Sequence, residues 1–431
     1  MRIQLLMTGS ELMRGTTVDT NAVRIADALA SIGLAVQRKV TIGDDLDLLV
    51  QELRTLSQHS DVLIVNGGLG PTSDDLTAQA LATATHTTLT ENTIALAHLE
   101  QWCNRTKIPL NAANRKQALL PAAAFILDNP VGSAVGFGMH LQHCLVLCTP
   151  GVPRELEAML IDSILPVLQR DYPDCEQQII LRLHMFGIGE SQAQDMVDAA
   201  IPHWPDGVVL GFRAGLPTVE IKLLARASAA NIAHEYFAKL KTLFANYIVA
   251  EGEQNLASAL LDTLAAQGKT LACAESCTGG LISAMLTEIP GSSRVFTAGF
   301  VTYSNSMKTV MLDVSEQTLE KHGAVSEQTV REMVAGTLTH SGADYAVAVS
   351  GVAGPDGGTA DKPVGTVWIA WGSTTNHGEQ RIETQRFLIS GPRKRFQQLV
   401  AAIALDQVRR QVSGFSNPPP YFQRWQPHSA T

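Results

Sequence analysis

Three potentially nucleophilic side chains stand side by side in the stretch LACAESCTGGLISAML, at Ser276, Cys277 and Thr278. They follow an apolar run typical of a strand and precede two glycines that would open a helix. Free backbone N–H groups at a helix start favour anionic oxygen, so a hydroxyl there could attack a carbonyl or accompany a bound phosphate. Two alternatives remain open. Ser276 or Thr278 could only cap the helix, and the thiol of Cys277 would be the better intrinsic nucleophile if the helix start lowered its pKa.

Two further strand ends of the same region carry polar side chains. The segment FVTYSNSMK supplies Tyr303 and Lys308, either of which could take a proton from a serine if burial or a neighbouring charge lowered its pKa. The segment AVAVSGVAGPDGGT supplies Ser350 and then a glycine-rich turn that could hold a phosphate on its amides. Lys308 could equally be an ordinary solvated lysine. Three such strand ends are harder to explain as helix caps than as one site.

Acidic residues gather in the amino-terminal part of the chain, at loops that follow strands or open helices. The segments TGSELMRG, DTNA, TIGDD and NGGLGPTSDDLT place carboxylates beside a glycine-rich turn. Such a set suits a hydrated divalent cation bridging to a phosphate. The alternative is that Asp19, Asp44 and Asp74 cap helices. The acids concerned are Glu11, Asp19, Asp44, Asp45, Asp74 and Asp75, and the glycines are Gly67, Gly68 and Gly70.

The elements that must position these residues predict an α/β protein with a small α+β module between two α/β domains. Residues 1–168 repeat a strand, turn and helix rhythm, and DVLIVN is typical of a strand buried on both faces of a parallel sheet. Residues 169–252 change rhythm and predict a linking module, and residues 253–412 predict a second α/β domain. The tail, residues 413–431, contains three consecutive prolines and predicts a flexible segment, or one pinned only by its aromatic residues.

Composition and charge narrow the class of protein. Hydrophobic residues make up 45% of the 431 positions and charged residues 17%, and no apolar run reaches the roughly 18 residues of a membrane helix. A net charge of −9, from 32 Lys and Arg against 41 Asp and Glu, disfavours direct binding of nucleic acid. The start MRIQLLMTGSE resembles a first strand more than a signal peptide, so we expect a soluble, cytoplasmic protein. The six scattered cysteines lack zinc-binding spacing and predict small buried side chains.

The motifs of the carboxyl-terminal part resemble one family. AESCTGGL, PGSSRVFTAGFVTYSNSMK, GAVSEQTV, SGVAGPDGGTADKPVGTVW and ISGPRKR are similar, in this order, to the carboxyl-terminal domain of the CinA family (competence/damage-inducible protein A). That domain also occurs alone as nicotinamide mononucleotide deamidase. The resemblance implies hydrolysis of the carboxamide of nicotinamide mononucleotide to nicotinate mononucleotide and ammonia, with no metal or other cofactor at this site.

The resemblance also implies roles for individual residues. Ser276 would be the nucleophile, or would orient the attacking water, and Lys308, with Tyr303 beside it, would be the base and later the acid. Arg393 would be the cationic clamp on the ribose phosphate. The family usually has threonine where this chain has Ser350, which predicts a change in affinity and not a loss of activity. The substrate-binding set would be Thr278, Gly279, Gly280, Ser350, Gly351, Gly354 and Arg393.

The acidic loops, together with NPVGSAVGF and TPGVPREL, resemble the molybdopterin-binding fold and the amino-terminal half of full-length CinA proteins. The resemblance implies a metal-dependent pyrophosphatase that cleaves ADP-ribose to AMP and ribose 5-phosphate. Asp44 and Asp75 occupy positions at which the molybdopterin-binding relatives keep functional acids, and Asp74 and Glu11 complete the predicted metal-binding set. The pyrophosphate would lie on Gly67, Gly68, Gly70 and Thr72.

Taken together, these features predict a bifunctional hydrolase of pyridine-nucleotide recycling that acts on two small nucleotides. An apolar closing helix and the resemblance make a homodimer plausible. Two other classes of function stay open. The amino-terminal domain could be a molybdopterin-binding module. The whole chain could also be a non-catalytic scaffold linked to competence or DNA damage, in which case Ser276, Tyr303 and Lys308 would not need to lie together.

Overall fold

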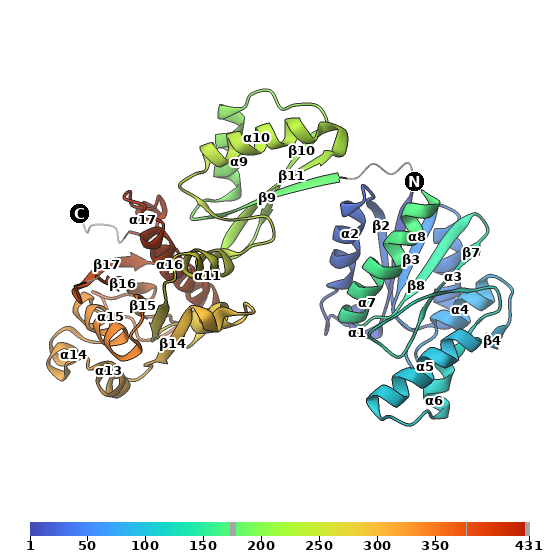
Figure 1. Cartoon of the computed structure of the whole chain (residues 1–431), viewed down its shortest axis with the longest axis horizontal. Helices are drawn as coiled ribbons and strands as arrows, with labels where there is room; N and C mark the ends of the chain where they lie inside the picture. The colour runs from blue at the N-terminus through green and yellow to red at the C-terminus, as the bar shows by residue number, and fades with distance from the viewer. Residues whose placement is uncertain (173–177, 376, 427–431) are drawn as a thin grey trace. The chain divides into compact units, whose positions relative to one another are not determined.

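The computed structural model describes residues 1–172, 178–375 and 377–426. The chain folds as two compact units, Met1–Ile179 and Ile180–Thr431. Figure 1 shows a mixed sheet with helices on both faces in the first unit, and a small sheet followed by a larger one in the second. The predicted α/β architecture with an α+β module is therefore confirmed.

The first unit is built on a six-stranded sheet of order β2-β1-β3-β8-β7-β6. Strands β2, β1, β3 and β8 are parallel to one another. Strand β7 pairs antiparallel with β8, and β6 pairs antiparallel with β7. Because the four parallel strands run in the same direction, their carboxyl ends meet along one border of the sheet. The strands are β1 (Ile3–Thr8), β2 (Val36–Ile42), β3 (Val62–Asn66), β6 (Phe125–Leu127), β7 (Gly136–Leu141) and β8 (Cys144–Thr149). A separate antiparallel pair is formed by β4 (Leu89–Glu91) and β5 (Leu119–Pro121).

Helices cover both faces of this sheet because the central strands are apolar throughout. Every residue of β1, β3 and β8 is buried. One core joins these strands to α3 and α4, and the other joins them to α2 and α7 (Figure 1). The helical segments are α1 (Ser10–Met13), α2 (Asn21–Ser31), α3 (Leu46–Ser57), α4 (Thr77–Ala84), α5 (Thr93–Thr106), α6 (Ala112–Arg115), the 3-10 turn Lys116–Ala118, α7 (Pro153–Met159), the π-helical turn Leu160–Ile164 and α8 (Leu165–Asp171).

The second unit begins with the α+β module. Its four-stranded sheet has the order β10-β11-β9-β12, and α9 and α10 share one hydrophobic core with it. The elements are β9 (Gln178–Phe186), α9 (Glu190–Ala200), β10 (Val208–Ala214), β11 (Thr218–Arg226), the 3-10 turn Ala227–Ala229, α10 (Ala230–Leu243) and β12 (Ile248–Glu251). Phe186 and Val249 also join the core of the following domain, so the module packs with that domain in one unit.

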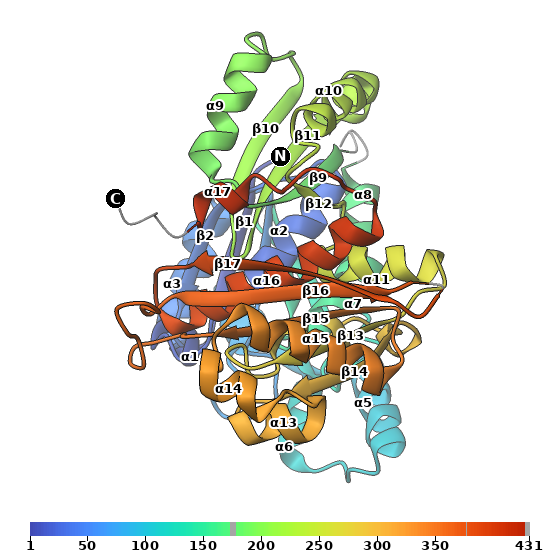
Figure 2. The same cartoon turned by 90° about the vertical axis from the view of Figure 1, so that its left-hand side faces the viewer.

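The following domain has a five-stranded sheet of order β14-β13-β15-β16-β17, parallel from β14 to β15 and antiparallel beyond. Figure 2 shows α13 to α15 on one side of the sheet, and α11 and α16 on the other, as the two separate cores require. The strands are β13 (Leu271–Glu275), β14 (Phe296–Val301), β15 (Tyr345–Gly351), β16 (Thr366–Thr374) and β17 (Gln380–Leu388). The helices are α11 (Leu256–Ala266), α12 (Leu281–Thr287), the 3-10 turn Ser292–Arg294, α13 (Asn305–Leu312), α14 (Glu316–His322), α15 (Glu327–Ser341) and α16 (Arg393–Val412).

Residues of the tail within 413–426 pack on their own domain, as the second of the two predicted alternatives requires. The tail forms α17 (Tyr421–Arg424), and Tyr421 is 2% exposed between Phe186 and Trp425. The Tyr421 hydroxyl donates to Asp406 Oδ2 at 2.6 Å. Aromatic burial and this hydrogen bond fix the segment, which is the pinning by aromatic residues that composition alone left as an alternative.

The closing helix α16 does not provide the free apolar face that suggested a homodimer. Nearly all of its apolar side chains are already buried in the core of its own domain. The homodimer therefore stays a prediction without that argument. None of the helices in the described ranges has the length and hydropathy of a bilayer-spanning segment.

Replacing Tyr421 by Phe tests whether the tail is part of the folded unit. Because Asp406 would lose a donor inside the protein, we expect the free energy of unfolding of the second unit to fall by about 1–3 kcal/mol. Calorimetry of the full chain measures this as a lower transition temperature of that unit. Tyr345→Phe is the control, because the Tyr345 hydroxyl makes no hydrogen bond in the described chain. Equal transitions for Tyr421→Phe and the wild type would contradict the assignment.

Candidate active sites

The carboxyl-terminal domain brings Ser276 and Lys308 into direct contact. Ser276 follows the last residue of β13, and Lys308 lies on α13, which follows β14, the neighbouring parallel strand. Lys308 Nζ donates to Ser276 Oγ at 3.1 Å and to the carbonyl of Thr302 at 2.8 Å. The Ser276 N–H donates to the carbonyl of Val349 at 3.1 Å, which fixes the serine backbone against β15. The pair is thus held by three strands that the sheet places side by side.

Burial changes the acid–base properties of this lysine. Lys308 is 1% exposed and Ser276 is 8% exposed. Removal of the amine from water lowers the pKa of Lys308, and the Cys277 thiol beside it opposes the shift only in part. A neutral lysine amine within hydrogen-bond distance of a serine hydroxyl can accept its proton. The alternative of a solvated lysine is therefore wrong.

Cys277 is the poorer nucleophile of the three candidates. Its side chain is buried, and this burial raises the pKa of the thiol to about 12. A helix start lowers a thiol pKa only where the helix amides reach the sulfur, and here desolvation outweighs them. Gln397 Nε2 donates to the carbonyl of Cys277 at 2.9 Å, which gives this residue a place in the packing.

The sequence predicts that the helix start after Ser276 is free to bind a substrate anion. The structure shows that it is not free. Glu275, fully buried at the end of β13, accepts the backbone N–H groups of Gly280, Ile282 and Ser283 at 2.8–3.0 Å. These are the first-turn donors of α12, so an internal carboxylate already satisfies them. The capping alternative for Ser276 and Thr278 is also wrong, because neither side chain caps α12.

The cavity beside the pair excludes some predicted substrate contacts. It has a volume of about 280 Å³, and Thr278, Gly279, Gly280 and Gly354 are outside its described wall. The residues that line it are Ser276, Cys277, Tyr303, Asn305, Lys308, Ala324, Val325, Ser350, Gly351, Ala353 and Arg393. Sequence reasoning missed Asn305, Ala324, Val325 and Ala353. Asn305 stands in the quoted YSNSMK segment, whereas no chemical signal marks the other three.

Tyr303 and Arg393 lie together at the mouth of this cavity. Tyr303 is 62% exposed, and its hydroxyl accepts from Arg393 at 3.2 Å; the structure gives it no bond to Lys308. A second Arg393 nitrogen donates to the carbonyl of Gly354 at 2.9 Å. These two bonds explain a cation in the first turn of α16, where the helix dipole disfavours it.

Ser350 is not arranged to donate a hydrogen bond to a phosphate. It is 1% exposed, and its hydroxyl donates to the carbonyl of Ala324 at 2.8 Å. The proton that a phosphate would need is therefore directed at the backbone. Ser350 instead holds the Ala324–Val325 segment against the cavity, and Gly351 lies beside it in the wall.

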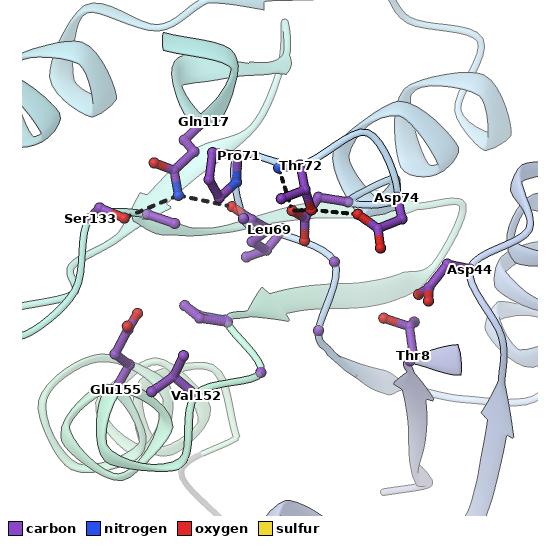
Figure 3. A pocket seen from close by; sticks show the side chains of 18 of the residues that line it. Thr8, Asp44, Leu69, Pro71, Thr72, Asp74, Gln117, Ser133, Val152 and Glu155 are labelled. Carbon is purple, nitrogen blue, oxygen red and sulfur yellow. Dashed lines mark hydrogen bonds between the residues drawn. The ribbon is translucent and has the colours of Figure 1, made fainter. Parts of the chain in front are cut away.

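The first unit carries a second polar cavity, of about 350 Å³, at the carboxyl ends of β1, β3 and β8 (Figure 3). Glu11, Asp44, Asp74 and Asp75 all line it, as do Gly67, Gly68, Gly70 and Thr72. Sequence reasoning missed Gln117, Ser133 and Glu155 in the same wall. Glu155 belongs to the quoted TPGVPREL segment, but nothing in its spacing identified it. Among the described wall residues no lysine, arginine or histidine balances the acids.

The predicted acids line the same wall, and Asp44, Asp74 and Asp75 accept hydrogen bonds from neighbouring residues. Asp44 accepts the N–H of Ser10 at 2.8 Å. Asp75 accepts the N–H and the hydroxyl of Thr72 at 2.8 and 2.6 Å, and Asp74 also accepts that hydroxyl. Helix α3 is capped by Asp45 and not by Asp44, so the capping alternative fails for Asp44. It holds in part for Asp19, which accepts the N–H of Ala22 in the first turn of α2.

The glycine-rich loop leaves fewer donors than predicted. Gly67 gives its N–H to the carbonyl of Thr149, and both donors of Thr72 are directed at acids. In the described chain, the amides of Gly68 and Gly70 have no acceptor and remain available to an anion. A Cβ on Gly70 would lie 2.5 Å from Asp75 Oδ2, so another residue there would displace that carboxylate.

The acids fit a hydrated cation better than a chelated one. Among the residues that the structure describes, no three His, Cys, Asp or Glu side chains gather closely enough to hold a metal ion by themselves. A Mg²⁺-like ion needs only one or two carboxylates when waters and substrate phosphates supply the other ligands. The acids of the wall suit such a cation.

Comparisons with known proteins identify the family of both halves of the chain. Residues 253–412 match the family described as CinA C-terminal domain, and residues 4–170 match the family described as probable molybdopterin binding domain. A CinA-like protein of Colwellia psychrerythraea is 48% identical over 424 residues, 97% of each chain. The chain belongs to the CinA family.

Another CinA relative, from Shewanella oneidensis, is named nicotinamide-nucleotide amidohydrolase PncC. It is 40% identical over 413 residues, which cover 96% of each chain. A crystal structure described as competence/damage inducible protein CihA from Agrobacterium tumefaciens is 40% identical, with a TM-score of 0.35, and covers 36% of this chain and 93% of that one. The family expected from the motifs is thus confirmed over nearly the whole chain.

The lowered pKa of Lys308 can be measured directly. Because burial favours the neutral amine, Lys308 should lose its proton at a pH below the ordinary lysine value of 10.5. The folded state should accordingly gain stability as the pH rises from the lowered pKa towards 10.5. NMR titration of lysine side chains, with Lys308→Arg assigning the resonance, gives the value. A Lys308 that titrates at or above 10.5 would exclude it as a base near neutral pH.

Proposed function

We propose that the carboxyl-terminal domain hydrolyses the carboxamide of nicotinamide mononucleotide to nicotinate mononucleotide and ammonia. The observation that carries this proposal is the 3.1 Å contact between buried Lys308 Nζ and Ser276 Oγ at the cavity wall. The name of the Shewanella oneidensis relative supports the same substrate. A non-catalytic scaffold would have no need of this buried pair.

In the proposed reaction, Ser276 Oγ attacks the carboxamide carbon as its proton passes to the neutral Lys308 amine. Lys308 then returns that proton to the nitrogen as the C–N bond breaks, so ammonia leaves and an acyl ester on Ser276 remains. Water gives a proton to Lys308 as it adds to the ester; the bond between the acyl carbon and Ser276 Oγ then breaks as Lys308 returns that proton to Oγ, and nicotinate mononucleotide is released. The carbonyl of Thr302 holds the amine in place through these steps.

We propose that Arg393 faces the substrate phosphate. Arg393 and Lys308 are the two basic residues of the described cavity wall. The hydroxyl of Tyr303 and the carbonyl of Gly354 orient Arg393. Bonds to these two neutral groups leave its charge free for a phosphate. Tyr303 would then act by positioning Arg393.

Ammonia release by three proteins tests which side chain reacts. We expect Ser276→Ala to reduce turnover of nicotinamide mononucleotide by at least about 10³-fold, because the attacking oxygen is removed. Cys277→Ala should retain activity within about tenfold, since the thiol is buried and protonated. Activity that survives in Ser276→Ala and disappears in Cys277→Ala would reverse the assignment. If none of the three proteins releases ammonia, the proposed reaction is excluded.

We further propose that the amino-terminal domain cleaves ADP-ribose to AMP and ribose 5-phosphate with a divalent cation. The all-acidic cavity supports a cation, and the amides of Gly68 and Gly70 could hold an anionic oxygen. The cation would neutralise the pyrophosphate and polarise it towards water. Asp44, Asp74 and Asp75 would hold this ion through one or two carboxylates and its bound water, and Thr72 would orient Asp74 and Asp75.

The match to a probable molybdopterin binding domain favours a second candidate for this half of the chain. A molybdopterin-binding module would retain a pterin through purification and would release no AMP. Absorbance and mass spectrometry of the denatured protein separate the two candidates.

Asp75→Asn tests the amino-terminal activity. We expect it to lower metal-dependent AMP release from ADP-ribose by at least about 100-fold, because a carboxylate charge is lost at the cation. Ammonia release from nicotinamide mononucleotide should be unchanged, since Ser276 and Lys308 belong to the other unit. Asp47→Asn, on the exposed side of α3, is the matched control. A parallel loss of both activities in Asp75→Asn would contradict two separate sites.

A further inference from the structure

One acid of the amino-terminal cavity stands apart from the others. Glu155 lies in the first turn of α7, and Figure 3 shows its carboxylate on the side of the cavity away from Asp44 and Asp74. The predicted metal-binding acids come instead from the loops after β1, β2 and β3. Glu155 is therefore not a member of that set, and its role must be sought at the opposite wall.

Glu155 is held in place by Asn129, which also fixes the backbone of the neighbouring turn. Asn129, 1% exposed, donates from Nδ2 to Glu155 Oε2 at 2.8 Å and to the carbonyl of Ala134 at 2.7 Å. Its Oδ1 accepts the N–H groups of Val131 and Gly132 at 3.1 and 3.0 Å. All four bonds of this amide are made, so its orientation is unambiguous. One oxygen of Glu155 is thereby fixed.

A glycine makes room for the same carboxylate. A Cβ on Gly132 would lie 1.9 Å from Glu155 Oε2, so any other residue would displace the acid. Glu155 Oε1 has no hydrogen-bond partner within the described chain. Burial also raises the pKa of Glu155, against the hydrogen bond from Asn129. The fold thus keeps a partly desolvated acid, with one oxygen open to the cavity, at a cost that calls for a compensating ligand contact.

The contacts of Glu155 limit the ligand group that it can face. A carboxylate repels phosphate, and Glu155 lies on the side of the cavity away from Asp44 and Asp74, which are the acids proposed to hold the cation. An ionised Glu side chain only accepts hydrogen bonds, so its partner must donate one. The donors of ADP-ribose are its ribose hydroxyls and the adenine amino group, and a carboxylate that accepts from ribose hydroxyls is the contact known from dinucleotide-binding folds.

We propose that Glu155 binds a ribose hydroxyl of the ligand, so that the amino-terminal cavity selects ribosyl 5′-phosphates over their deoxy analogues. This inference rests on the proposed function, because it places the phosphate of the same ligand at the cation and glycine loop. The ligand then spans the cavity from the acidic loops to α7. Glu155 is a specificity residue that does not touch the scissile bond.

Binding measurements on the full chain test this assignment. With MgCl₂ present, calorimetry compares AMP with 2′,3′-dideoxy-AMP, and ribose 5-phosphate with 2-deoxyribose 5-phosphate. We expect the wild type to prefer the hydroxylated member of at least one pair by about tenfold or more, the scale of a hydrogen bond to a charged group. Glu155→Gln keeps an acceptor for Asn129 and should abolish that preference without weakening the deoxy ligand. Glu157→Gln, on the exposed side of α7, should keep it.

The outcomes separate this inference from the proposed hydrolysis. Equal binding within both pairs, a preference that survives in Glu155→Gln, or binding of none of the four ligands would overturn the role of Glu155. AMP release from ADP-ribose is measured in parallel. A Glu155-dependent preference without any AMP release would uphold the binding role and refute the hydrolysis, and AMP release without the preference would do the reverse.

Discussion

The removal of one lysine amine from water is the interaction on which the carboxyl-terminal site depends. Lys308 is buried although most lysines are solvated, and its nitrogen contacts only the Ser276 hydroxyl and the Thr302 carbonyl among the bonds described. Such burial is costly for an ammonium ion but not for a neutral amine. The folding energy of β13, β14 and α13 therefore maintains a base that an exposed lysine would not provide.

The same domain shows how a buried charge can be compensated completely. Glu275 lies one residue before Ser276 and is fully buried, yet it accepts three backbone N–H groups and the Ser283 hydroxyl. The carboxylate thus stabilises the start of α12 and anchors the turn that carries the serine. Burial of Glu275 is compensated by hydrogen bonds, whereas burial of Lys308 lowers the pKa of its amine.

The amino-terminal cavity presents the opposite electrostatic problem. Five acids line it, and no basic residue lies in its described wall. A cation would create the affinity for phosphate that the side chains lack. The two halves of the chain therefore approach phosphorylated ligands differently, with Arg393 in one and a bound cation in the other as the proposed positive charge.

The sequence by itself determined the family, the strand ends and most of the site. Apolar runs such as DVLIVN predicted buried parallel strands, and parallel strands place their carboxyl ends together, so Ser276 and Lys308 could be predicted as neighbours. The sequence could not predict which acceptor each donor would bond, or which donors would already be paired inside the protein. Only the tertiary structure showed that Glu275 fills the helix start, that Ser350 donates to a carbonyl, that Tyr421 fixes the tail and that Glu155 faces the acids. Each of these depends on side chains far apart in sequence, whose partners exist only after the chain has packed.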